Sequence, residues 1–215
     1  MKYKIFAGTC LVLIGIFLAT SFYYKAQQAE QYDAMAKHNL STFVRAYSQT
    51  LGNADAKVVL VEFMDPACET CAAFSPIVKQ MMADNPGKIK LVLRYAPFHD
   101  GADYFVKILE AAKNQEKYWE TLEVMFNSQS EWASHHTPQP QKIWQFLPAA
   151  GLDLDRIKQE MNDPEIAKRI EQDLADANTL NVRKTPGFFV NGKPLETFGS
   201  KQLYQLIQSE IKANY

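Results

Sequence analysis

The feature that most constrains the fold of this chain is a pair of cysteines, Cys68 and Cys71, which follows directly on a short apolar segment. Residues 56–63 (AKVVLVEF) form a continuous β-branched run of the kind found in strands buried on both faces. After Cys68, apolar residues recur at helical spacing until Asn85-Pro86-Gly87 predicts the end of the helix. The cysteine pair is therefore expected at a strand-to-helix junction.

The remaining strand signals lie on either side of a long helical stretch. Residues 88–95 (KIKLVLRY) alternate and predict a second strand, whereas residues 100–181 carry amphipathic helical patterns. Residues 187–198 predict a β-hairpin, because Asn191-Gly192 suits a type I′ turn, and a last helix closes the chain. This order predicts an α/β fold, a small mixed sheet whose parts before and after a helical insertion pair with each other.

Composition excludes several broad classes of protein. With 23 basic and 24 acidic side chains the formal charge is -1, which gives no basic excess for a nucleic-acid partner. The apolar share of 47% and the charged share of 22% are those of an ordinary folded protein. Three cysteines are too few for a disulfide-stapled miniprotein or a four-thiolate zinc site.

The amino end predicts export. Residues 5–24 are uncharged and 15 of these 20 are apolar, a length that spans a membrane, and Lys2 and Lys4 before it favour a cytoplasmic amino end. We expect residues 1–25 to be an uncleaved anchor of the inner (cytoplasmic) membrane, with a cleaved signal at Ala19-Thr20-Ser21 as the alternative. Cys10 is then an apolar helix residue, and residues 26–54 are a stalk and lead-in segment.

The spacing of Cys68 and Cys71 is used by three chemistries: a metal site, a structural disulfide and a redox dithiol. The helix start favours the redox dithiol, because free N–H groups and the helix dipole stabilise a Cys68 thiolate. Cys71, one turn on and more buried, would resolve a mixed disulfide. In an exported domain these two thiols form one redox pair.

Two positions outside the cysteine pair also carry information. Glu62 lies in the apolar strand, where a carboxylate is costly without a role, and we expect it to exchange a proton with Cys71. A glutamate at a strand end that reaches solvent or a basic partner is the alternative. Thr185-Pro186 precedes the hairpin, and spacing alone favours an ordinary turn proline there.

Several segments together resemble the DsbA-like family of exported thiol:disulfide oxidoreductases, which have a thioredoxin fold. The resemblance covers residues 51–215 and rests on LGNADAKVVLVEFMDPACETC, RYAPFHD, AAKNQEKYWETLEVMF and TPGFFVNGKPL. It includes the spacing of Glu62, of Pro76 within the first helix, and of Thr185-Pro186.

The resemblance implies an architecture and a substrate site. Residues 55–99 and 182–215 would form the thioredoxin-like domain, and residues 100–181 the inserted helical domain. Pro186 would be cis and lie beside the dithiol, and the Thr185 backbone would hold a substrate peptide as an extended strand. Exported proteins with cysteines would be substrates, a membrane redox partner would reset the dithiol, and no cofactor or metal would be needed.

The dipeptide between the cysteines departs from the family pattern. Well-known oxidants of the family have proline and histidine there, whereas this chain has Glu69 and Thr70. A carboxylate beside Cys68 opposes thiolate formation, and a histidine can support it. We therefore expect a weaker oxidant than a histidine-containing relative, and the direction of the reaction stays open.

A copper-binding or copper-delivery module is the alternative function, using Cys68 and Cys71 with His99 or Met64. Its weakness is that Met64 and the cysteines do not form a Met-x-Cys-x-x-Cys motif. His135 and His136 are adjacent and predict a polar loop instead of one metal site. The tryptophans are expected to pack, without chemistry: Trp119, Trp132 and Trp144.

Overall fold

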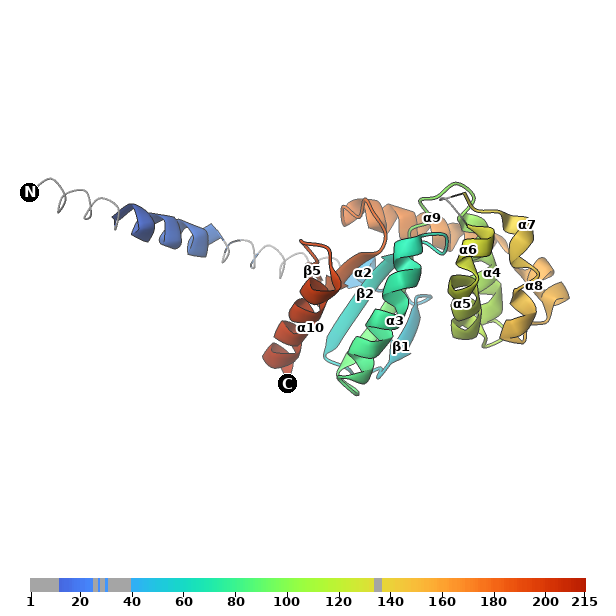
Figure 1. Ribbon diagram of the computed structural model, residues 1–215, viewed down its shortest axis with the longest axis horizontal. Helices are drawn as coiled ribbons and strands as arrows, with labels where there is room; N and C mark the ends of the chain where they lie inside the picture. Colours follow the sequence, from blue (N-terminus) through green and yellow to red (C-terminus); the bar gives the residue numbers. More distant parts are fainter. Residues whose placement is uncertain (1–11, 25–26, 28–29, 31–39, 134–136) are drawn as a thin grey trace, which may run out of the picture. The chain divides into compact units, whose positions relative to one another are not determined.

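The computed structural model of the protein describes residues 12–24, 27, 30, 40–133 and 137–215, and it contains two units, residues 1–40 and 41–215 (Figure 1). In the first unit residues 12–24 are helical and expose large apolar side chains such as Phe17 and Phe22. Within the described ranges no helix is long and apolar enough to cross a bilayer. Residues 5–11 of the expected anchor lie outside those ranges, so the anchor stays a prediction.

A five-stranded mixed sheet in the order β1-β3-β2-β4-β5 organises residues 41–215. β2 (Val58–Met64) is central, parallel to β3 (Ile89–Tyr95) and antiparallel to β4 (Gly187–Val190). β5 (Lys193–Pro194) completes the hairpin with β4. Segments before and after the helical stretch are thus neighbours in one sheet, which confirms the expected α/β arrangement.

The sequence analysis missed one strand. β1 (Gln49–Gly52) pairs antiparallel with β3 at the edge of the sheet and lies within the segment 26–54 that was expected to be stalk and lead-in. Its four residues alternate between half-buried and exposed, so the hydrophobic pattern that reveals central strands is too weak to show it.

Helices cover both faces of the sheet. α3 (Glu69–Ala83) and α10 (Ser200–Asn214) lie side by side on one face (Figure 1), where Val58, Leu60 and Met64 point into the larger core. α2 (Leu40–Phe43) and the end of α9 (Pro164–Thr179) contribute to a second core on the other face, with Val61 and Phe63. The alternation of side chains along β2 therefore feeds two cores.

The helical stretch forms a block beside the sheet (Figure 1). It contains α4 (Asp103–Lys113), α5 (Tyr118–Asn127), α6 (Gln129–Trp132), α7 (Pro140–Ile143), the 3-10 helix η2 (Leu147–Ala150) and α8 (Leu154–Glu160). Trp132 is fully buried against Phe105, with ring centroids 4.1 Å apart, while Trp119 and Trp144 are half-buried at the same core. Because this core is continuous with that of the sheet, residues 41–215 form one compact unit.

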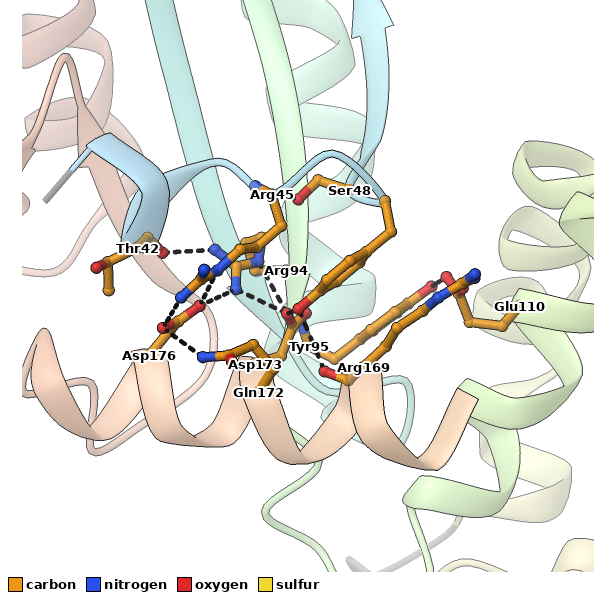
Figure 2. A network of polar contacts seen from close by, with 11 residues as sticks. Thr42, Arg45, Ser48, Arg94, Tyr95, Glu110, Arg169, Gln172, Asp173 and Asp176 are labelled. Atoms are coloured by element: carbon orange, nitrogen blue, oxygen red, sulfur yellow. Dashed lines mark hydrogen bonds and ion pairs between the residues drawn. The ribbon is translucent and has the colours of Figure 1, made fainter. Parts of the chain in front are cut away.

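Buried charges attach α9 to the sheet (Figure 2). The fully buried Arg94 of β3 donates to Asp173 Oδ1 at 2.7 Å and to Asp176 Oδ2 at 2.5 Å, both on α9. Arg45 adds a second cation to Asp176, and the Tyr95 backbone N–H donates to Asp173. Two carboxylates thus face two guanidinium groups, and the charges of the cluster balance.

Candidate active site

Cys68 is the N-cap residue of α3, between the end of β2 and the first helical turn. Its φ of -80° and ψ of 117° are those of an extended residue, and its own N–H donates to the Asp65 carbonyl at 3.0 Å. No side chain caps this helix start. The N–H groups of the first turn are therefore directed towards the Cys68 side chain.

The Cys68 sulfur is an activated thiol. The pKa of Cys68 is lowered to about 5, first by a hydrogen bond from the Cys71 side chain and, against the effect of burial, by bonds from Thr185 and from the backbone N–H groups of Cys71 and Thr70. At neutral pH Cys68 is thus a thiolate, the form that attacks disulfides.

Cys71 has the opposite character. Its side chain is fully buried, and burial, followed by the hydrogen bond to Cys68 and the charge of Glu62, raises the pKa of Cys71 well above its ordinary value. The two thiols are not joined in this structure. Cys68 is 6% exposed and Cys71 is 0% exposed, so an activated thiolate is backed by a more deeply buried neutral thiol, the arrangement that a nucleophile and its resolving partner need.

Glu62 lies beneath α3 on the face of β2 that points into the larger core. It is 4% exposed, and burial, with a smaller effect from the Cys68 thiolate, raises its pKa to about 8. A small cavity of about 20 Å³ borders it, also lined by Ser75 and Lys79, which is room for about one water molecule. A carboxyl group of this pKa can both accept and return a proton at neutral pH.

The loop before β4 meets the dithiol. The Thr185–Pro186 bond is cis, as the family resemblance implied, and the Cys68 sulfur lies 3.3 Å from the Thr185 carbonyl oxygen. Pro186 is buried, whereas Thr185 is half-buried. Thr185 and Pro186 come from a segment more than a hundred residues from Cys68, and the sheet brings them together through the pairing of β2 with β4.

Glu69 and Thr70 are both exposed in the first turn of α3. The Thr70 N–H is one of the groups that stabilise the Cys68 thiolate. The pKa of Cys68 is lowered even though the next residue, Glu69, carries a carboxylate. The comparison with a histidine-containing relative remains a prediction. Pro76 lies within α3, five residues after Cys71.

Among the described residues, His99 is not grouped with Cys68 and Cys71 as a metal site. His99 Nδ1 lies 2.7 Å from Asp65 Oδ2, and Met64 is buried in the core. In the part of the chain that the structure describes, no three His, Cys, Asp or Glu side chains are grouped as a metal would require. His135 and His136 lie outside the described residues.

Two residues near the dithiol escaped the sequence analysis. Asp65 is fully buried and accepts from the backbone N–H groups of Ala67 and His99. Gln129 of α6 donates to the Pro66 and Cys68 carbonyls. An aspartate three residues before the first cysteine could have drawn attention, whereas nothing in the sequence links Gln129 to a loop 61 residues away.

A family model described as "Thioredoxin" matches residues 44–209, which include both cysteines, Glu62 and the cis-proline loop. The chain belongs to the thioredoxin family. The match begins before β1, in agreement with the five-stranded sheet.

Solved structures show which thioredoxin architecture is present. A thioredoxin-like oxidoreductase from Silicibacter pomeroyi is 24% identical, with a TM-score of 0.69 over 81% of this chain and 98% of that one. BdbD from Bacillus subtilis is 23% identical, with a TM-score of 0.68 over 77% and 94%. The catalytic domain of Proteus mirabilis ScsC is 15% identical, with a TM-score of 0.69 over 84% and 98%. At these identities the likeness is one of fold, and the fold is that of the DsbA-like proteins.

Curated relatives are longer proteins. The chain is 30% identical over 144 residues to the Na(+)/H(+) antiporter NhaA of Herminiimonas arsenicoxydans, covering 67% of this chain and 22% of that protein. NhaA 3 of Salinispora tropica is 31% identical over 145 residues, covering 66% and 21%. The chain thus spans about a fifth of the length of these relatives.

Proposed function

We propose that this protein is a thiol:disulfide oxidoreductase that exchanges disulfides with cysteines of exported proteins through Cys68 and Cys71. The observation that carries the proposal is the pairing of a stabilised Cys68 thiolate, next to the Thr185 carbonyl, with a buried neutral Cys71. Each group has a distinct part in a two-step exchange.

In the reducing direction the Cys68 thiolate attacks a substrate disulfide. The substrate S–S bond breaks, one substrate sulfur leaves as a thiolate, and a mixed disulfide joins Cys68 to the other sulfur. Glu62, as a carboxylate, then takes the proton of Cys71, and the Cys71 thiolate attacks Cys68. The Cys68–substrate bond breaks, the second substrate thiolate leaves, and two electrons have passed from the protein to the substrate.

The same steps run in reverse when the protein oxidises its substrate. A substrate thiolate attacks Cys68 of the protein disulfide, Cys71 leaves and takes up a proton from Glu62, and a second substrate thiolate releases Cys68. The redox partner that resets the dithiol sets the direction in the cell. Thiol alkylation in growing cells tests this point, since a mostly oxidised pair indicates an oxidase and a mostly reduced pair a reductase or isomerase.

Thr185 and Pro186 shape the substrate site in this proposal. The Thr185 carbonyl is 3.3 Å from Cys68, so a peptide bonded to Cys68 lies within reach of the Thr185 backbone and can align as an extended strand. Thr185 is half-buried, so part of this residue is accessible to such a peptide.

We place the catalytic unit on the outer side of the inner membrane, held by residues 5–24. The helix over residues 12–24 supports this proposal, because its large apolar side chains are exposed and would be covered by lipid. Separating membranes from soluble contents of the cells tests it: the full chain is expected with the membranes, and recovery in the periplasmic fraction would indicate a cleaved signal.

Reduction of insulin disulfides tests the enzymatic proposal. Wild type is expected to accelerate insulin reduction by dithiothreitol, and Cys68→Ser to abolish the acceleration because the nucleophile is lost. Gln80→Ala, at an exposed position of the same helix, is the control. A fully active Cys68→Ser protein would contradict the proposal.

A further inference from the structure

One side chain of the helical block holds two carbonyl groups of the loop before α3, those of Pro66 and of Cys68 itself. Gln129 Nε2 lies 2.8 Å from the Pro66 carbonyl oxygen and 3.1 Å from that of Cys68. Both partners are acceptors, so the amide must direct its NH₂ group towards them, and both of its N–H donors are used. We call this pair of hydrogen bonds the Gln129 clamp.

The helical block holds Gln129 rigidly. Gln129 is 5% exposed and begins α6, which ends at the fully buried Trp132. The Trp132 ring packs on Phe105 of α4, and its Nε1 donates to the Met125 carbonyl of α5 at 3.1 Å. The clamp thus ties the Cys68 loop to the centre of the block.

The Asp65 side chain holds the same loop from within. Its Oδ1 accepts from the Ala67 N–H at 2.8 Å, and its Oδ2 accepts from the His99 N–H at 2.9 Å. With the Gln129 clamp, each of residues 65–68 is bonded through its backbone or its carboxylate. The clamp holds the peptide plane after Cys68 through the Cys68 carbonyl, and the plane before Cys68 is held by the Cys68 N–H, which donates to the Asp65 carbonyl at 3.0 Å.

Those two planes decide where the sulfur lies. An N-cap residue keeps its side chain over the first turn only while its backbone stays extended, as it does at Cys68. The first-turn N–H groups of Thr70 and Cys71 reach the sulfur only in that geometry. The Cys68 carbonyl also accepts the N–H of Ala72 that closes this turn, at 3.2 Å.

We propose that Gln129 is a positioning residue for disulfide exchange, whose two hydrogen bonds keep Cys68 in the N-cap geometry that favours its thiolate. The inference rests on the proposed function and adds to it a contribution of the helical block to the chemistry. Without the clamp the loop between β2 and α3 becomes more mobile, and the Cys68 sulfur is hydrogen-bonded to the first-turn N–H groups for only part of the time. Because these bonds stabilise the thiolate, the reduced dithiol becomes less stable relative to the disulfide.

Gln129→Met tests the clamp, because methionine has nearly the same length and shape and no donor. Gln141→Met, at an exposed position in α7, is the matched control. The measurements are the pH titration of the Cys68 thiolate by ultraviolet absorbance and the equilibrium constant for reduction of the protein disulfide by glutathione. Gln129→Met is expected to raise the thiolate pKa and to lower the constant roughly three- to tenfold, the effect of one or two lost hydrogen bonds.

Gln129→Glu gives a second, independent test that does not depend on a change of volume. A carboxylate at this position has only acceptors and cannot bond to the two carbonyls. The changes in the Cys68 pKa and in the equilibrium constant should therefore be at least as large as in Gln129→Met. Both variants could fold, exchange disulfides and have the same Cys68 pKa and the same equilibrium constant with glutathione as wild type. That result would show that the clamp has no positioning role. An inactive wild type would instead contradict the proposed function, so the two failures are distinguishable.

Discussion

At the residue scale, the difference between Cys68 and Cys71 arises from burial and from the direction of hydrogen bonds. Both sulfurs lie in the first turn of one helix, yet Cys68 receives N–H and S–H donors while Cys71 is enclosed and donates. Sequence spacing predicts this asymmetry, because a helix start has free N–H groups only at its beginning. The sequence also singles out Glu62, because a carboxylate within an apolar strand is costly without a role.

The pKa of Glu62 gives a prediction on stability. A carboxyl whose pKa rises from 4.5 to about 8 on folding stabilises the fold below its unfolded pKa and loses this contribution as pH rises through about 8. Cys68, whose pKa falls from 9.0 to about 5, acts in the opposite sense, since its contribution is lost as pH falls through about 5. In the reduced protein the two effects offset each other between about pH 5 and pH 8.

Glu62→Gln removes one of these two effects. The free energy of unfolding of the reduced variant should rise relative to that of wild type across this pH range, by on the order of 1 kcal/mol per pH unit. Urea unfolding at several pH values measures it, with Glu171→Gln at an exposed position of α9 as the control. Profiles for Glu62→Gln and wild type that stay parallel would show that Glu62 ionises normally in the fold.

Glu69 gives a second prediction at this scale. Glu69→His replaces a carboxylate next to the Cys68 sulfur by a group that can support a thiolate, so the reduction potential should rise. A titration with glutathione measures it, and a rise of about 30 mV corresponds to a tenfold change in the equilibrium constant. A potential that stays the same or falls would show that the dipeptide does not limit the oxidising strength.

At the element scale, the central strands and the dithiol helix could be predicted because their own residues contain the signal. β2 lies in a continuous apolar run, β3 alternates, and α3 is periodic. β1 has only four half-buried or exposed residues, and its pairing with β3 depends on a partner some 40 positions away. For the same reason Gln129 could not be predicted as part of the site, since its place depends on how α6 packs.

α9 depends on a buried ion cluster for its attachment to the sheet (Figure 2). Asp173 accepts from Arg94, from the Tyr95 N–H at 2.7 Å and from the Tyr47 hydroxyl at 2.6 Å, and it is 1% exposed. Asp173→Asn keeps the shape and removes the charge, leaving the buried Arg94 without this partner. We expect the free energy of unfolding to fall by about 3–5 kcal/mol.

The exposed pair of Glu165 and Lys168 on the same helix provides the control for this prediction. Glu165→Gln breaks an ion pair that is surrounded by water, so it should change stability little. Equilibrium denaturation of both variants measures the difference. An Asp173→Asn protein as stable as Glu165→Gln would show that the buried cluster does not hold α9.

At the scale of the whole molecule, the helical block and the sheet act as one unit. A continuous core joins them, and their elements together surround the dithiol: α3 carries the cysteines, the loop before β4 provides Thr185, and α6 provides Gln129. The expected division into a thioredoxin-like domain and an inserted helical domain describes the order along the chain, whereas the active site draws on both parts.

The central claim is that Cys68 attacks and Cys71 resolves. Cys71→Ser leaves the Cys68 thiolate in place and removes the group that releases the substrate, so covalent complexes should accumulate in cells. Non-reducing electrophoresis after rapid acid quenching measures them, and they should vanish on reduction and in the Cys68→Ser/Cys71→Ser double variant. Complexes of equal amount in the double variant, or none in Cys71→Ser when the protein is folded and exported, would contradict the account.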